Sequence, residues 1–137
     1  MASKTFPGKF IHLEQICEFV TKEAKDAGLN DESIYAVQLA VDEACTNIIE
    51  HAYSDEENGD IVCECKNVGD GLEIILKDHG KPFDPDSIPE PKIGVPLQDL
   101  KSRGAGLYLI RKLMDEVTFD FNGSGESILK MKKMKSG

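Results

Sequence analysis

The sequence predicts a small α+β protein, with two helices first, then a hairpin, then a third helix and two closing strands. Apolar residues recur at intervals of three and four over residues 11–27 and 31–53, as in amphipathic helices. They alternate with polar residues over 61–67 and 72–78, as in strands with one buried face. A chain of 137 residues can bury a core of its own, so we expect a single domain over residues 1–137.

The first helix is predicted from Ile11 to Ala27, because Gly28 is a natural C-terminal stop. The second is predicted to begin after a cap at Asn30 or Asp31 and to run to about residue 53. Its core stripe consists of Ile34, Val37, Val41, Ala44, Ile48 and Ala52. The adjoining face of this helix holds small and apolar residues, together with one polar pair.

Two strands follow, at about Ile61–Asn67 and Leu72–Asp78, and Gly69-Asp70-Gly71 between them is typical of a hairpin turn. The alternation in the second strand continues as far as Asp78. That carboxylate therefore ends an inward-facing apolar row, which is an unusual place for an unpaired charge.

The stretch from Lys81 to Arg103 carries most of the prolines and shows no sustained period. A loop of this length inside a compact domain is usually functional or disordered. A third helix is predicted to start near Gly106, and the closing strands are predicted at about Val117–Phe121 and Ser127–Lys133.

The composition of the chain argues against several classes of function. The chain is 40% hydrophobic and 30% charged, which is ordinary for a globular protein. A net charge of −9 argues against nucleic acid or an anionic membrane as the main partner. The sequence contains no apolar run long enough to span a membrane and no segment that resembles a signal peptide, so we expect a cytoplasmic protein.

The four cysteines do not follow a disulfide or zinc pattern. Cys17 and Cys45 fall on the apolar sides of predicted helices, and Cys63 and Cys65 share one face of a strand. We expect reduced thiols that act as small hydrophobic side chains.

Glu43 and Asn47 form the most informative pair in the chain. Their spacing of four places both side chains on one helix face, one turn apart. Amide oxygens suit Mg²⁺, which takes few protein ligands when phosphate oxygens complete its shell, so Asn47 is a candidate ligand. Glu43 is placed to accept a proton from a group that attacks a γ-phosphate. The alternative is an ordinary pair of polar residues at a helix surface.

Two further segments fit a nucleotide. Asp78 can accept a hydrogen bond from an exocyclic amine such as that of adenine, and Gly80 lets the backbone approach a base. The run Gly104-Ala105-Gly106 at a helix start offers free backbone amides to phosphate, with Lys101 and Arg103 nearby to add charge. The alternatives are a simple turn at Asp78 and a plain loop before the third helix.

The order and spacing of these motifs resemble those of the GHKL (Bergerat-fold) ATPases. The stretch from Glu43 to Asn47 resembles their N box, the stretch 78–85 their G1 box, and Gly104-Ala105-Gly106-Leu107 the start of their G2 box. The intervening segment, at about 84–103, corresponds to an ATP lid. The resemblance implies an α+β, two-layer α/β sandwich with helices on one face of a mixed, mostly antiparallel sheet, and Mg-ATP between the layers.

Within that superfamily the chain is most similar to the anti-sigma factor serine/threonine kinases. The similarity rests on Glu-Ala-x-x-Asn-x-x-x-His-Ala-Tyr (43–53), Pro-Phe-Asp-Pro (82–85) and Leu-Ile-Arg-Lys-Leu-Met-Asp-Glu-Val (109–117). It implies a kinase that phosphorylates a STAS-domain anti-anti-sigma partner, holds a sigma factor inactive and forms a homodimer. Members usually open with a strand, but here residues 3–9 contain a proline, so that strand is predicted to be very short or missing.

Two other functions remain open at this point. One is a switch kinase that phosphorylates a STAS partner without binding a sigma factor. The other is a non-catalytic ATP-binding module whose nucleotide state sets its choice of partner. The presence of Glu43 favours the two kinases over the module, because simple binding of ATP needs no general base.

Overall fold

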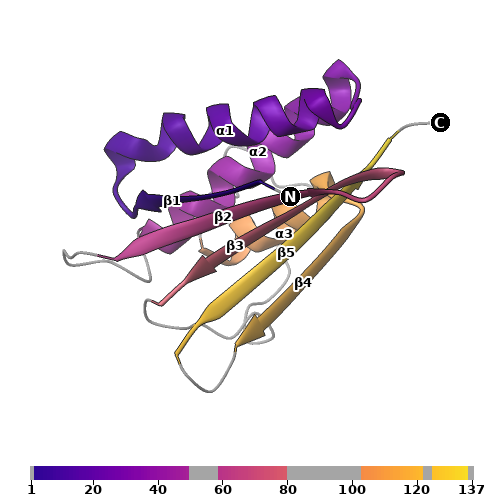
Figure 1. Ribbon diagram of the computed structural model, residues 1–137. Coiled ribbons are helices and arrows are strands. Elements are labelled where there is room, and N and C mark those ends of the chain that lie inside the picture. Colours follow the sequence, from indigo (N-terminus) through magenta and orange to yellow (C-terminus); the bar gives the residue numbers. More distant parts are fainter. Residues whose placement is uncertain (1, 50–58, 80–102, 122–124, 136–137) are drawn as a thin grey trace.

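The computed structural model describes residues 2–49, 59–79, 103–121 and 125–135. One antiparallel sheet has the strand order β1-β2-β3-β5-β4, and three α-helices lie on the same face of it (Figure 1). The strands are β1 (Ala2–Pro7), β2 (Asp60–Asn67), β3 (Gly71–Asp78), β4 (Glu116–Phe121) and β5 (Ser127–Met134). The helices are α1 (Leu13–Asp26), α2 (Asp31–Asn47) and α3 (Arg103–Leu113), with a short 3₁₀ helix η1 (Phe10–His12) before α1.

The predicted α+β, two-layer class is confirmed, and the four predicted strands lie within one residue of their expected ends. Every strand pair in the described sheet is antiparallel, so the sheet is not mixed. The predicted cap of the second helix is also confirmed. The Asn30 Oδ1 atom accepts a hydrogen bond of 2.8 Å from the Ser33 backbone N–H, which satisfies one free amide of the first turn.

The expectation about the N-terminal strand is wrong. β1 is six residues long and pairs with β2 along its whole length, from Ala2 opposite Cys65 to Pro7 opposite Asp60. The proline does no harm because it is the last residue of an edge strand, where a missing N–H breaks no ladder. Phe6 anchors the strand, since its ring is buried and lies edge-on to the Phe19 ring at 5.9 Å between centroids.

Two helix boundaries also differ from the prediction. α3 begins at Arg103, three residues before Gly106, so the two glycines lie in its first turn. The first turn tolerates them because its amides have no partners within the helix in any case. The second helix is described as far as Asn47, with Ile48 and Ile49 continuing in a wider π-helical turn. Its predicted end at residue 53 and the predicted lid at 84–103, apart from Arg103 itself, lie outside the described residues.

The core lies between the two layers. The inward rows of the three central strands, which include Ile61, Ile74 and Leu76, meet the buried stripes of α1 and α2, such as Val20 and Val41. In the described part of the chain, no helix is both long and apolar enough to cross a membrane.

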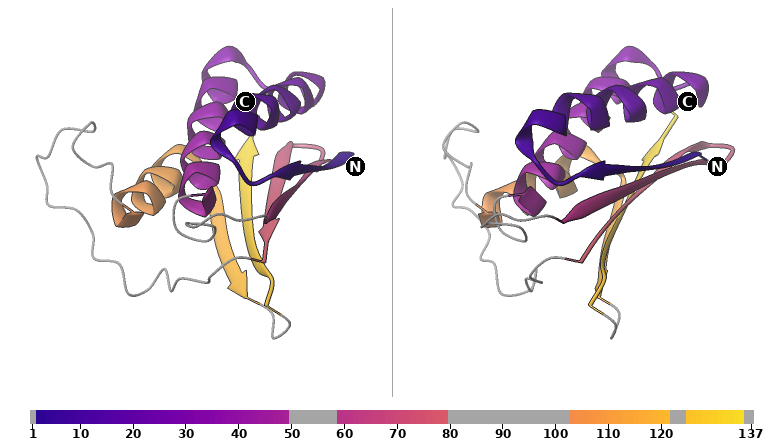
Figure 2. Two further views of the ribbon diagram at one scale, coloured as in Figure 1. Left: turned by 90° about the vertical axis from the view of Figure 1, so that its left-hand side faces the viewer. Right: turned by 60° about the vertical axis from the view of Figure 1, so that its left-hand side comes forward.

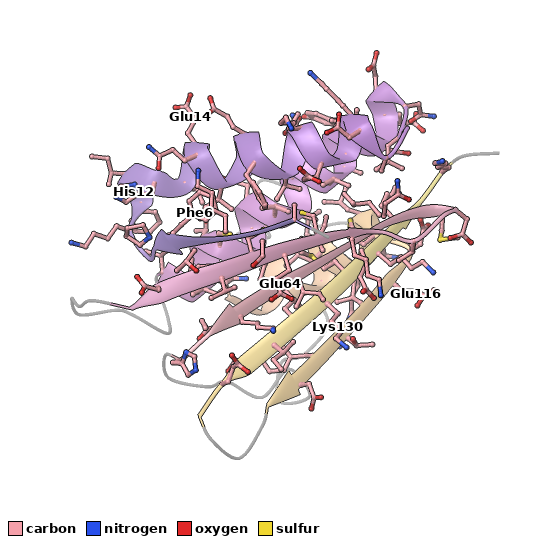
Figure 3. All side chains as sticks on the ribbon, viewed as in Figure 1. Phe6, His12, Glu14, Glu64, Glu116 and Lys130 are labelled. Atoms are coloured by element: carbon pink, nitrogen blue, oxygen red, sulfur yellow. The ribbon has the colours of Figure 1, made fainter. Side chains whose placement is uncertain are left out.

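The opposite face of the sheet is open and charged (Figure 3). Residues of alternating sign lie side by side across four strands in the order Lys66, Glu73, Lys132 and Glu116. The Lys77 Nζ atom also lies 3.3 Å from the Glu64 Oε2 atom on neighbouring strands. This pattern is typical of a solvated face, because opposite charges that face each other across strands are stabilising while they stay hydrated.

All four cysteines are free thiols, as predicted, and three of them are buried. Burial and the nearby Asp42 carboxylate raise the pKa of the half-buried Cys17 thiol from 9.0 to about 11. Burial raises the pKa of Cys45 still further, and a hydrogen bond with Cys65 together with burial raises that of Cys63. The thiolate is the reactive form, so these side chains should be inert.

We therefore expect slow reaction with an aromatic disulfide reagent at pH 8. A two-unit rise in pKa lowers the thiolate fraction of Cys17 about a hundredfold, and the buried thiols are also shielded. In the native protein at most one thiol should react, at a rate roughly a hundredfold below that of free cysteine. All four should react at once in urea. Rapid labelling of two or more thiols without denaturant would contradict this assignment.

Candidate functional site

The C-terminal end of α2 presents two polar side chains to the space beside the sheet. Asn47, the last residue of α2, is only 8% exposed, and Glu43 is half-buried one turn earlier. Ala40 and Ala44 on the same helix are buried, and such small side chains allow close packing. The apolar stripe of α2 thus continues into a polar end, and Figure 2 shows that end beside α3.

Asp78 lies at the end of β3, where the inward row of Leu72, Ile74 and Leu76 stops. Its side chain is 6% exposed and therefore faces the helical layer, as the alternation predicted. A carboxylate in such a place is costly unless polar groups meet it. It is suited to a ligand that brings hydrogen-bond donors.

Ser127 is a further candidate site residue, which the sequence alone did not single out. It is the first residue of β5, lies directly opposite Asp78 in the ladder and is 4% exposed. Its Oγ atom has no hydrogen-bond partner among the described residues. A buried hydroxyl without a partner typically costs about 1–3 kcal/mol, which a ligand can offset. The alternation of Ser127, Leu129 and Met131 in the sequence indicates that Ser127 belongs to the inward row of its strand. Only the register of β5 on β3 shows that Ser127 lies opposite Asp78.

The strand ends at this place are joined by one further contact. The His79 Nε2 atom lies 3.8 Å from the Glu126 Oε2 atom, next in sequence to Asp78 and Ser127 respectively. The imidazole is largely exposed, so the pair adds little stability. The backbone ladder, in which Asp78 lies opposite Ser127, keeps the end of β3 beside the start of β5.

Of the remaining predicted site residues, the structure describes five as part of a helix and does not describe the other two. Arg103, Gly104, Ala105, Gly106 and Leu107 form the first turns of α3, which packs against α2. The free backbone amides of a helix N-terminus favour an anion. Gly80 and Lys101 lie outside the described residues.

The chemistry of these donors fits a phosphate-bound metal ion better than a metal held by protein alone. No group of three or more histidine, cysteine, aspartate or glutamate side chains in the described ranges could hold a metal. Mg²⁺ characteristically takes one or two protein oxygens and completes its shell with water and phosphate oxygens. The Asn47 amide oxygen is a ligand of that kind, and the N-terminus of α3 is suited to the phosphates.

Comparison with known proteins agrees with this geometry. Residues 6–133 match the model of the histidine kinase-like ATPase domain. The serine-protein kinase RsbW of Halalkalibacterium halodurans is 38% identical over 117 residues, which are 82% of this chain and 71% of that protein. RsbW of Bacillus subtilis is 36% identical over 110 residues, 77% of this chain and 68% of that protein.

The chain belongs to the RsbW family of serine-protein kinases, within the histidine kinase-like ATPases. Solved structures support the fold. The RsbU and RsbW domains of a Mycobacterium tuberculosis protein superpose with a TM-score of 0.64 at 12% identity, covering 98% of this chain and 32% of that one. A blue-light activated histidine kinase of Erythrobacter litoralis gives 0.56 at 17% identity, covering 90% of this chain and 59% of that one.

In this RsbW family member, the orphaned hydroxyl of Ser127 gives a test with two readouts. Ser127→Ala should leave the melting temperature unchanged or raise it, because the hydroxyl has no hydrogen bond to the described residues and a buried polar group is removed. ATP affinity should fall roughly three- to tenfold, the equivalent of one neutral hydrogen bond. Thermal unfolding and calorimetric titration measure the two effects.

The matched control is Thr21→Val on α1. The Thr21 hydroxyl donates to the Cys17 carbonyl at 2.7 Å and accepts from the Gln38 amide at 3.0 Å. Its removal should destabilise the fold by about 1 kcal/mol and leave ATP affinity unchanged. A Ser127→Ala protein that is less stable yet binds ATP normally would assign this hydroxyl a structural role.

Proposed function

We propose that this chain is an ATP-dependent serine/threonine kinase that phosphorylates a STAS-domain anti-anti-sigma protein and otherwise sequesters a sigma factor. The observation that carries the proposal is the polar end of α2, where Asn47 and half-buried Glu43 lie one turn apart in an RsbW-family fold. We further propose that the protein acts in the cytoplasm as a homodimer.

The pair formed by Asp78 and Ser127 supports recognition of adenine. Buried Asp78 can accept a hydrogen bond from the exocyclic amine, which guanine lacks at that position. The Ser127 hydroxyl can donate to or accept from a neighbouring ring nitrogen or a bridging water. Gly80, two residues after Asp78, gives the base room to approach the backbone.

The phosphate groups of ATP are assigned to a second part of the site, which consists of the end of α2 and the start of α3. The Asn47 amide oxygen would bind Mg²⁺, which would neutralise charge on the phosphate oxygens as the transfer proceeds. The backbone amides of the first turn of α3 (Arg103 to Gly106) would hold the phosphate chain, with Leu107 following them. Lys101 and the side chain of Arg103 are proposed to add charge-assisted contacts.

Glu43 is proposed as the catalytic base. As the partner's hydroxyl oxygen forms its bond to the γ-phosphorus, its proton passes to the Glu43 carboxylate, and the bond to the leaving ADP oxygen breaks. A carboxylate that is half-buried at the end of a helix is held in place without losing access to the incoming hydroxyl.

The two alternative functions, a non-catalytic module and a switch kinase, differ in whether they require a carboxylate at position 43. A non-catalytic module would need Asn47 and Asp78 but no carboxylate at position 43, and the half-buried Glu43 therefore favours a kinase. A switch kinase that never binds a sigma factor would use the same residues. A pull-down with tagged protein, with and without ATP, distinguishes these two by the partners recovered.

The first test concerns the metal. Asn47→Ala should lose Mg²⁺-dependent ATP binding while the fold stays intact, because the amide is replaced at the edge of the core and not within it. Asn47→Asp keeps an oxygen ligand and should retain part of the affinity. Calorimetry with and without Mg²⁺ measures both, and equal ATP binding by Asn47→Ala and the parent protein would remove Asn47 from the site.

The second test separates a kinase from a binding module. Glu43→Ala should bind Mg-ATP almost as well as the parent, yet transfer radiolabelled phosphate to the recovered partner about 10²–10⁴-fold more slowly. The matched control is Asp42→Ala, because Asp42 is the adjacent carboxylate and lies near Cys17 on the side of α1. Undiminished transfer by Glu43→Ala would exclude this residue as the base, and no transfer by the parent to any partner would favour the module.

A further inference from the structure

The C-terminal end of α3 lacks the residues that usually end a helix well. The helix stops at Leu113, and the next residues are Met114-Asp115-Glu116, so no glycine is present to turn the chain there. The last carbonyl groups of a helix have no partners within it, and carboxylates beside the negative end of the helix dipole are unfavourable. This end of α3 therefore depends on groups from outside the helix.

Three consecutive residues of β5 supply those groups. The Lys133 Nζ atom donates a hydrogen bond of 2.8 Å to the Leu113 carbonyl oxygen. The Lys132 carbonyl accepts one of 2.9 Å from the Asp115 backbone N–H, and the Asp115 Oδ2 atom accepts one of 2.6 Å from the Met134 backbone N–H. We call these three hydrogen bonds the α3 clasp. The ammonium group of Lys133 both satisfies a terminal carbonyl and offsets the charge of the helix end.

Lys133 occupies the last position of a row that is otherwise buried. Strand alternation places it on the inward face of β5, in the row that begins with Ser127. Its neighbour Lys132 lies on the open face, where the Nζ atom is 4.0 Å from the Asp70 Oδ1 atom. A lysine that faces the helical layer is costly unless its ammonium group has a partner, and the Leu113 carbonyl is such a partner.

The N-terminal end of α3 extends away from the sheet. Figure 2 shows the helix joining the strands at its C-terminal end, with its first turn farther from them. The fully described core residues of this region, Ile110 and Met114, also lie towards the clasp. With 11 residues, α3 is about 16 Å long. A rotation of about 5° at the clasp would move the first turn by more than about 1 Å.

We propose that Lys133 is a positioning residue for the nucleotide, which acts by holding α3 in the direction that aims its first-turn amides, residues 103–106, at the phosphates. This inference rests on the proposed function, which assigns the phosphates to that turn. A displacement of about 1 Å weakens several amide–phosphate hydrogen bonds at once. The inward row of β5 thus serves the site twice, through Ser127 opposite Asp78 and through Lys133 behind α3.

Replacement of Lys133 tests this role. Lys133→Met keeps the length of the side chain but loses the hydrogen bond and the charge, so calorimetric ATP affinity should fall roughly tenfold. Adenosine has no phosphates, so its affinity, measured by NMR titration, should stay that of the parent. Without any nucleotide, the amide signals of Gly104 and Gly106 should also shift. Lys133→Arg keeps a charged donor and should restore both the affinity and the signals.

Two controls separate position from charge and from stability. Lys132→Met makes the same change in charge one residue earlier, on the open face, and Thr21→Val weakens the fold on α1. Both should bind ATP like the parent and leave the two glycine signals in place. Asp115→Ala removes a different bond of the clasp and should reproduce the effects of Lys133→Met.

The results also distinguish this inference from the proposed function. Parent-like ATP affinity and unmoved glycine signals in Lys133→Met, equal weakening of ATP and adenosine, or an equal effect of Lys132→Met would each overturn the role of Lys133. A parent protein that binds no ATP would instead overturn the proposed function. The glycine signals are recorded without nucleotide, so they would still show whether Lys133 holds α3 in place.

Discussion

The packing of α2 against the centre of the sheet is the contact on which the rest of the molecule depends. The buried stripe of α2, with Val37, Val41 and Ala44, lies over the inward rows of the central strands. Both surfaces are apolar until their ends, where the helix finishes with Asn47 and the neighbouring strands with Asp78 and Ser127. The hydrophobic interface therefore fixes the position of polar groups that would not associate on their own.

A site built in this way combines a large apolar contact area with buried polar groups, and one of these, the Ser127 hydroxyl, has no hydrogen-bond partner among the described residues. A buried carboxylate and a buried hydroxyl are unfavourable in an apolar core, and they persist because a large apolar contact area holds the elements together. The Ser127 hydroxyl is therefore suited to gain a hydrogen bond from a ligand. The part of the fold that costs stability is the part proposed to bind the nucleotide, as is common for functional sites.

The sequence was most informative where a pattern is local. Alternation predicted the inward orientation of Asp78, and helical spacing predicted the shared turn of Glu43 and Asn47, because both depend on a few neighbouring residues. It was wrong about β1, where one proline appeared to exclude a strand, since the harmlessness of Pro7 depends on its place at the end of an edge strand. Ser127 was missed for a related reason, because its importance comes from the residue across the ladder and not from its own neighbours.

The open face of the sheet has a mechanical consequence. A second layer stacked on it would have to dehydrate the alternating row of Lys66, Glu73, Lys132 and Glu116, which is unfavourable. Among the described elements, a second layer therefore covers only the helical face of the sheet. The cohesion of the two described layers therefore depends on a single buried interface, the apolar one between the helices and the inner face of the sheet.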